Sequence, residues 1–163
     1  MHIQTFALLL FAFTCNAGFL DKGCPLLHNG DMSFDLNDLT HPEAYTTTLD
    51  NGEVLYYNVC GISSPPLESC PQHSASYVTD KAENYCKGVA FNPQLYMKDE
   101  DVIIEHGENS DLTIQIRCSE EHDFLELNAQ VVNGHIFIIA QSKLVCKDEG
   151  SRLRILQTPD SNT

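Results

Sequence analysis

Basic residues are scarce in this sequence, which has nine Lys and Arg against 23 Asp and Glu and a net charge of −14. The phosphates of nucleic acids and anionic membrane surfaces repel so acidic a chain, so we expect neither as a partner. Long apolar runs are also lacking. The run Phe6–Phe13 is far shorter than the roughly 20 apolar residues that a membrane-spanning helix needs. The sequence therefore predicts no membrane span.

The short apolar run at the start is typical of a secretory signal. Phe6–Phe13 is followed by small residues up to Ala17, where a signal peptidase would cut. We expect residues 1–17 to be removed and the remaining chain to be secreted or to lie in the lumen of the secretory or endolysosomal pathway.

Closely spaced cysteine pairs of the C-x₂-C kind, which hold zinc, are missing. Of the seven cysteines, Cys15 lies in the predicted signal, and the nearest pair among the other six is Cys60 and Cys70. An even number of cysteines in an oxidising compartment predicts disulfides. Six cysteines allow 15 pairings, and spacing alone does not choose among them.

Catalytic and metal-binding motifs are absent as well. No two histidines have a metalloprotease spacing, no serine sits in a G-x-S-x-G frame, and Asp99-Glu100-Asp101 lacks the pattern of a calcium loop. We interpret the histidines as surface residues and the acidic run as a solvated turn. The sequence predicts no enzyme, no metal and no cofactor.

What is present is β-strand patterning. Asn51-Gly52 and Asn133-Gly134 each separate two β-prone runs, which predicts two hairpins with type I′ turns. Residues alternate between apolar and polar in several runs, and none has a sustained helical period. The predicted strands are Val54–Val59, Ser76–Thr79, Leu95–Lys98, Val102–Glu105, Leu112–Cys118, Phe124–Val132 and His135–Gln141, the last being the most central. This pattern predicts an all-β domain, either a sandwich or a flattened barrel.

The order of these features resembles the mannose 6-phosphate receptor homology (MRH) domain. The resemblance rests on Cys24, on Phe34-Asp35-Leu36 and Tyr45, and on the frame Tyr57-Asn58-Val59-Cys60-Gly61, and it extends to Cys146. It implies one domain over residues 18–148, a flattened β-barrel of two crossed antiparallel sheets stapled by disulfides. It also implies the pairings Cys24–Cys60, Cys70–Cys86 and Cys118–Cys146. Residues 149–163 have one apolar patch, Leu153, Ile155 and Leu156, and we expect them to form a partly disordered tail.

The resemblance further implies where a sugar would bind. Lectins of this family hold mannose with a Gln, an Arg, a Glu and a Tyr, and the matching positions here are Tyr77, Ser110, Val131 and Ile136. Under a different alignment Glu126 serves as the Glu, and Gln94 is a second candidate for sugar contact. The paired tryptophans of related lectins have no counterpart, because the sequence has no Trp.

Two functions follow from this reading. In the first, the chain is an MRH-like binding protein with a degenerate sugar site that binds a protein or glycoprotein partner, with a homodimer as one form. In the second, it is a divergent lectin for mannose-type or phosphomannosyl N-glycans. The loss of the arginine favours the first, because a guanidinium is the group best suited to paired contacts with a sugar or phosphate.

Overall fold

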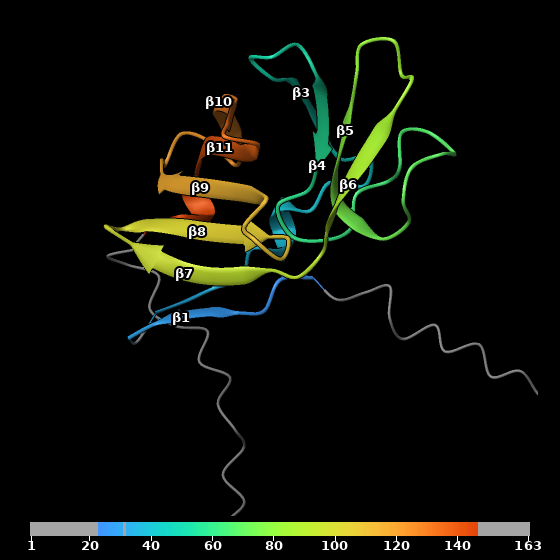
Figure 1. Cartoon of the computed structure of the whole chain (residues 1–163). Helices are drawn as coiled ribbons and strands as arrows, with labels where there is room; N and C mark the ends of the chain where they lie inside the picture. Colours follow the sequence, from blue (N-terminus) through green and yellow to red (C-terminus); the bar gives the residue numbers. More distant parts are fainter. Residues whose placement is uncertain (1–22, 31, 147–163) are drawn as a thin grey trace, which may run out of the picture.

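The computed structural model describes residues 23–30 and 32–146 (Figure 1). The predicted signal, residues 1–17, and the predicted tail, residues 149–163, lie outside the described residues. Within the described part, the regular elements are strands and two short 3₁₀ turns, η2 (Asn37–Leu39) and η3 (Lys143–Val145), with no α-helix. The predicted all-β class is confirmed.

The strands form two main sheets and one small hairpin. The five-stranded sheet has the order β10 (Leu125–Val132), β11 (His135–Ser142), β9 (Leu112–Cys118), β8 (Asp101–His106) and β7 (Gln94–Lys98). The four-stranded sheet has the order β3 (Tyr45–Thr48), β4 (Val54–Tyr57), β5 (Ser74–Thr79) and β6 (Cys86–Ala90). The hairpin consists of β1 (Leu27–Asn29) and β2 (Met32–Phe34).

The two main sheets cross, and their facing sides enclose the core (Figure 1). Alternation in β9 places Leu112, Ile114 and Ile116 inside, and each is fully buried. From the other sheet, Leu55 and Tyr57 of β4 are also fully buried. The predicted crossed-sheet arrangement is confirmed, and no ladder between described strands joins one main sheet to the other.

Two details of the five-stranded sheet differ from the sequence prediction. The pair β9 and β11 is parallel, so this sheet is mixed and not purely antiparallel. The middle strand is β9, whereas the run His135–Gln141 forms β11, one place nearer the edge. A tight hairpin joins β10 to β11, so these two strands are antiparallel. β11 lies between β10 and β9 and runs parallel to β9.

The two Asn-Gly hairpins both form, but with different turns. At Asn133-Gly134 both residues have positive φ, 52° and 84°, between the paired Val132 and His135, so the type I′ turn is confirmed. At Asn51-Gly52 only Gly52 has positive φ. There Leu49 and Glu53 are bonded across a three-residue loop, which is a type I turn followed by a left-handed glycine. The predicted type I′ turn is wrong at that hairpin.

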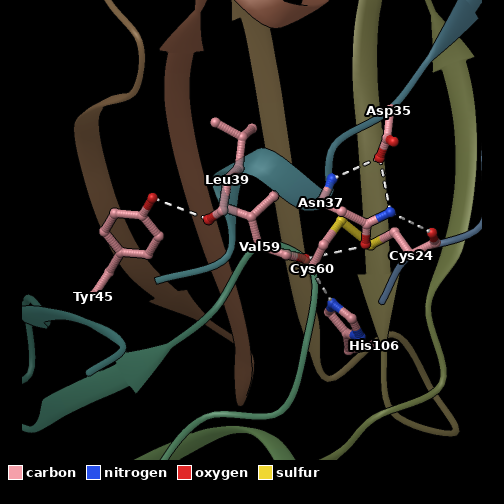
Figure 2. The surroundings of a disulfide bond; sticks show 8 residues. All are labelled: Cys24, Asp35, Asn37, Leu39, Tyr45, Val59, Cys60 and His106. Atoms are coloured by element: carbon pink, nitrogen blue, oxygen red, sulfur yellow. Dashed lines mark hydrogen bonds between the residues drawn. A yellow bond between two sulfur atoms is a disulfide. The ribbon is translucent and has the colours of Figure 1, made fainter. Parts of the chain in front are cut away.

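Three disulfides staple the fold, and they join the pairs that the MRH resemblance implies. Cys24–Cys60 ties the segment before β1 to the end of the β4 region (Figure 2). Cys70–Cys86 holds the loop between β4 and β5 against β6. Cys118–Cys146 ties the end of β9 to the segment after η3. Each bridge restricts the unfolded chain and is expected to contribute about 2–4 kcal/mol.

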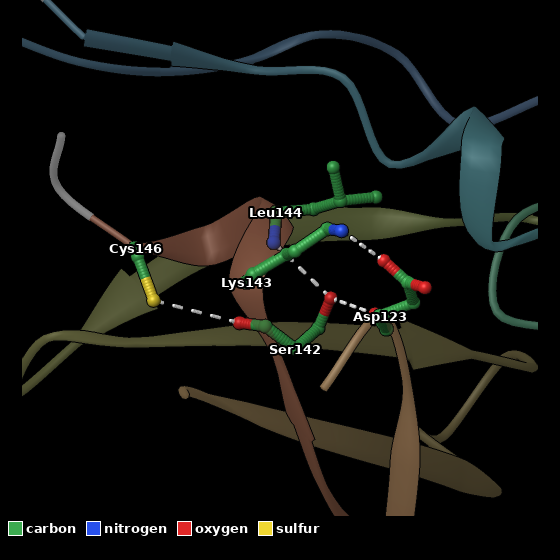
Figure 3. A network of polar contacts seen from close by, with 5 residues as sticks. All are labelled: Asp123, Ser142, Lys143, Leu144 and Cys146. Atoms are coloured by element: carbon green, nitrogen blue, oxygen red, sulfur yellow. Dashed lines mark hydrogen bonds and ion pairs between the residues drawn. The ribbon is translucent and has the colours of Figure 1, made fainter. Parts of the chain in front are cut away.

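The segment after β11 is fixed by a compact polar network (Figure 3). The Ser142 hydroxyl accepts from the Leu144 N–H, 3.2 Å away, and donates to the Asp123 carbonyl. Lys143 forms an ion pair with the Asp123 carboxylate, and the hydrogen bond in this pair raises the pKa of Lys143. These contacts end the strand, begin η3 and place Cys146 beside Cys118.

Candidate binding site

The two sheets are joined by side chains along a seam between β4 and β10. The Tyr57 hydroxyl donates a hydrogen bond to Oε2 of Glu126 at 2.6 Å. Tyr57 is fully buried, and Glu126 is half-buried. A β-bulge between Glu126 and Asn128 interrupts β10 at this point, and such bulges commonly redirect a side chain. The short distance and the ionisable acceptor make this a strong bond.

Aromatic rings surround the bonded pair. The ring of Tyr45 lies 4.6 Å from that of Phe124 and 5.4 Å from that of Tyr57, measured between centroids. His41 extends the cluster, with its ring 5.4 Å from Tyr45. The Tyr45 hydroxyl donates to the Leu39 carbonyl at 3.0 Å, so its polar end is also satisfied within the chain. The seam is therefore filled by the protein's own side chains.

The environment keeps Tyr57 protonated. Burial raises the pKa of Tyr57, and the hydrogen bond to Glu126 and the charge of Glu126 raise it further. Tyr57 is thus a fixed donor to the carboxylate of Glu126. One acceptor position of Glu126 Oε2 is therefore taken by the Tyr57 hydroxyl in the folded protein and is not available to a sugar hydroxyl.

The two residues predicted to contact sugar lie on opposite faces of the five-stranded sheet. Glu126 is paired with Ala140, which is fully buried on the core side. Gln94 is paired with Glu105, which is adjacent in β8 to the buried, inward-facing Ile104. Because adjacent residues of a strand point to opposite faces, Glu105 and Gln94 lie on the outer side of the sheet, where Gln94 is exposed. The structure does not bring Glu126 and Gln94 together. Contact of either residue with a sugar stays a prediction.

Of the four positions that match the lectin residues, three lie close together, because Val131 is paired with Ile136 and the Ile136 N–H donates to the carbonyl of Asp111, the neighbour of Ser110. The fourth, Tyr77, lies in the other main sheet. Tyr77 is fully buried on the face of the four-stranded sheet opposite to Tyr57, since Ser76 is the residue paired with Tyr57. Ser110 donates from its hydroxyl to Glu105 at 3.0 Å. Ile136 is buried and apolar, and Val131 is half-buried with its N–H bonded to Asp50. Under this alignment, no group of free polar side chains converges at these positions.

The residues that carry the MRH resemblance have structural roles here. Asn58 is 1% exposed and links two loops, because its Oδ1 accepts from the His41 N–H and its Nδ2 donates to the His41 and Ile62 carbonyls. Beside the first disulfide, the Asp35 carboxylate and the Cys24 carbonyl both accept from Nδ2 of Asn37 (Figure 2). The frame therefore specifies the fold around Cys24–Cys60.

One histidine contradicts the expectation that all of them lie on the surface. His106 is fully buried, stacks on Phe91 with 5.5 Å between ring centroids, and has Nε2 3.5 Å from the Val59 carbonyl (Figure 2). Its Nδ1 has no hydrogen-bond partner. Burial lowers the pKa of His106 to about 4. The sequence pattern already indicated a buried position, because His106 continues the inward-facing series Val102 and Ile104 in β8.

A second feature, on the outer face of the five-stranded sheet, was missed by the sequence analysis. A groove of about 380 Å³ crosses β7, β8, β9 and β11. It is lined by two aromatic rings and by charged side chains, among them Tyr96, Lys98, Asp99, Asp101, Glu105 and Phe137. The predicted acidic turn is part of it: Asp99 and Glu100 have φ of 52° and 80° and form the tight connection between Lys98 and Asp101.

Metal binding finds no support in the described residues. The close group of potential ligands there is Cys118, Glu120 and Cys146. The two sulfurs are joined in a disulfide, so neither is a thiolate that could hold a metal.

Comparison with known proteins supports the fold alone. No family model matches the sequence, and no curated protein matches it significantly. Among solved structures, domain 11 of the echidna mannose 6-phosphate/IGF2R receptor aligns with a TM-score of 0.57 and 18% identity over 76% of this chain and 95% of that one. Chicken IGF2R domain 11 aligns with a TM-score of 0.55 and 16% identity over 76% of this chain and 92% of that one. The chain has an MRH-like fold.

No helix in the described ranges 23–30 and 32–146 has the length and apolarity to cross a membrane.

Proposed function

We propose that this chain is a non-enzymatic binding protein of the secretory or endolysosomal lumen or the extracellular space, which uses its MRH-like barrel to bind a protein or glycoprotein partner. It recognises the protein part of that partner. In this proposal the sugar site is degenerate and the seam between the sheets is a structural element.

The observation that carries this proposal is the hydrogen bond between Tyr57 and Glu126. Glu126 is the residue of β10 that the alternative alignment assigns as the lectin glutamate, and its carboxylate is bonded inside the chain at 2.6 Å. The Tyr57 hydroxyl takes one acceptor position of this carboxylate, and a sugar hydroxyl that took the same position would displace a fully buried group. Leaving a buried hydroxyl without a partner costs about 1–3 kcal/mol, which opposes sugar binding.

The alternative is a divergent lectin for mannose-type or phosphomannosyl N-glycans. It requires the half-buried Glu126 to accept from a sugar hydroxyl, either in place of Tyr57 or at another acceptor position of its carboxylate, with other contacts from residues outside the four matching positions. The two functions differ in what part of a glycoprotein is recognised, and this difference can be measured.

The test is capture of a partner before and after removal of its glycans. The purified, oxidised protein is immobilised and exposed to luminal and secreted proteins of its own source at pH 7 and pH 5.5. Bound proteins are then treated with an enzyme that removes N-glycans. Partners that stay bound, and that rebind after deglycosylation, support protein recognition. Partners that are released by deglycosylation or by free mannose would establish the lectin function and refute the proposal.

A further inference from the structure

The outer groove has the chemistry of a site for guanidinium groups. Its lining carries three carboxylates, Asp99, Asp101 and Glu105, against one ammonium, Lys98, together with the rings of Tyr96 and Phe137. A guanidinium pairs with carboxylates through parallel hydrogen bonds and stacks on aromatic rings, so it satisfies both kinds of lining at once. We propose that this groove binds an arginine-bearing segment of a protein partner. The inference rests on the proposed function and names the surface and the chemistry of the partner.

The groove is built by the register of adjacent strands, with the turn between β7 and β8 contributing Asp99. Tyr96 of β7, Ile103 of β8 and Gln115 of β9 are directly paired and so share the outer face. Ile103 is only 5% exposed although it lies on that face, so it forms the floor beneath longer side chains. A site on adjacent strands of one sheet holds its groups in fixed positions, which reduces the entropy lost on binding.

Two of the carboxylates are already oriented by neighbours. Glu105 accepts from the Tyr96 hydroxyl and from the Ser110 hydroxyl, each at 3.0 Å. Asp101 accepts from the Gln115 amide, and its Oδ2 lies 3.4 Å from Nε of Arg117. A carboxylate has about four acceptor positions, so both side chains retain capacity for a ligand. The contact with Arg117 is an instance, within the chain, of a guanidinium held at this face.

Charge complementarity favours a cationic occupant and excludes an anionic one. The groove lies on a protein with a net charge of −14. The field of the whole chain therefore repels anionic ligands and speeds the approach of basic ones. A volume of about 380 Å³ lies at the lower end of the range for small-ligand sites, which fits one or two side chains and not a folded element.

The test is a titration of the full-length, isotopically labelled protein, followed by NMR, with three capped pentapeptides. They alternate glycine with arginine, with lysine or with citrulline, which has the shape of arginine without its charge. We expect the arginine peptide to shift resonances of β7, β8 and β9 around Tyr96 and Glu105. The lysine peptide should bind at least threefold more weakly, and the citrulline peptide should not bind. Equal binding of the arginine and lysine peptides, or shifts spread over all acidic surfaces, would overturn the proposal.

Variants make the assignment specific. Asp101→Asn with Glu105→Gln should weaken arginine-peptide binding at least fivefold, and Tyr96→Leu should weaken it at least threefold. Glu83→Gln removes an exposed carboxylate on the four-stranded side and should have no effect. The dispersion of each spectrum reports folding directly. Unchanged affinity in the folded Asp101→Asn, Glu105→Gln variant would overturn the proposal.

Other occupants give distinct results. If Arg152→Gln with Arg154→Gln in the full chain shifts the resonances of the groove, the chain's own segment is the occupant and the partner assignment is wrong. If a captured partner binds the groove variants as tightly as the unaltered protein, the proposed function stands and the groove assignment fails. If deglycosylation releases every partner while the arginine peptide still occupies the groove, the proposed function fails independently of the groove chemistry.

Discussion

The hydroxyl of Tyr57 and the carboxylate of Glu126, 69 residues apart in the sequence, meet at 2.6 Å between the two sheets. This contact has two consequences. It connects β4 to β10 where no ladder between described strands joins the sheets, and it engages the carboxylate that a lectin reading assigns to sugar. The stability of the fold and the proposed loss of sugar binding thus involve the same pair.

The first prediction concerns this bond. Tyr57→Phe removes the donor and leaves the Glu126 carboxylate without its partner in a half-buried site. We expect the free energy of unfolding to fall by about 1–2 kcal/mol, measured by urea denaturation. Tyr56→Phe is the matched control, because Tyr56 is the next residue on the opposite face of β4 and is only half-buried. Equal losses in the two variants would mean that the bond does not stabilise the fold.

The second prediction concerns acid stability. Burial lowers the pKa of His106 from 6.5 to about 4, so between these values the unfolded chain binds a proton that the folded chain does not. The free energy of unfolding should therefore fall as the pH falls through this window, by about 2 kcal/mol at pH 5 relative to pH 7.5. Denaturation across pH 4–8 measures it.

A substitution isolates the histidine. In His106→Phe nothing titrates at this position, and the loss of stability between pH 7.5 and pH 5 should shrink by about 2 kcal/mol. His28→Gln, at an exposed position, serves as the control substitution of a histidine. If the pH dependence is the same with and without His106, the lowered pKa is refuted.

The third prediction tests the close approach of β6 to the loop before β5. A Cβ on Gly88 would overlap the Ser74 hydroxyl and lie 3.3 Å from the Pro71 Cγ. Gly88→Ala should therefore destabilise the protein by about 1–3 kcal/mol through overpacking. Ser74→Ala removes the nearest atom, so the double variant should recover part of the loss. Thermal unfolding of the four proteins forms a double-mutant cycle, and strictly additive effects would contradict the account.

The sequence predicted the fold well where the information is local. Alternation located β9 with the correct bounds, and the Asn133-Gly134 pair gave the correct turn. The same dipeptide at Asn51-Gly52 gave the wrong turn. The loop length there is set by the pairing of Leu49 with Glu53, and the dipeptide alone does not encode that register.

The candidate sites depend on contacts that sequence patterns do not contain. No periodicity relates Tyr57 to Glu126, because their meeting depends on how two sheets cross. The outer groove likewise arises from the register of four strands, which places Tyr96 and Phe137 on one face. Gln94 and Glu126 are each plausible alone, and only the sheet geometry shows that they lie on opposite faces.

The most direct test of the central claim is a glycan array probed with the folded, fully oxidised protein at pH 7 and pH 5.5. The account predicts no binding to mannose-type or phosphomannosyl glycans at either pH, for the unaltered protein and for an Asp101→Asn, Glu105→Gln variant alike. Binding to these glycans that is lost in Glu126→Gln would contradict it, because the carboxylate bonded to Tyr57 would then be a working part of a lectin site.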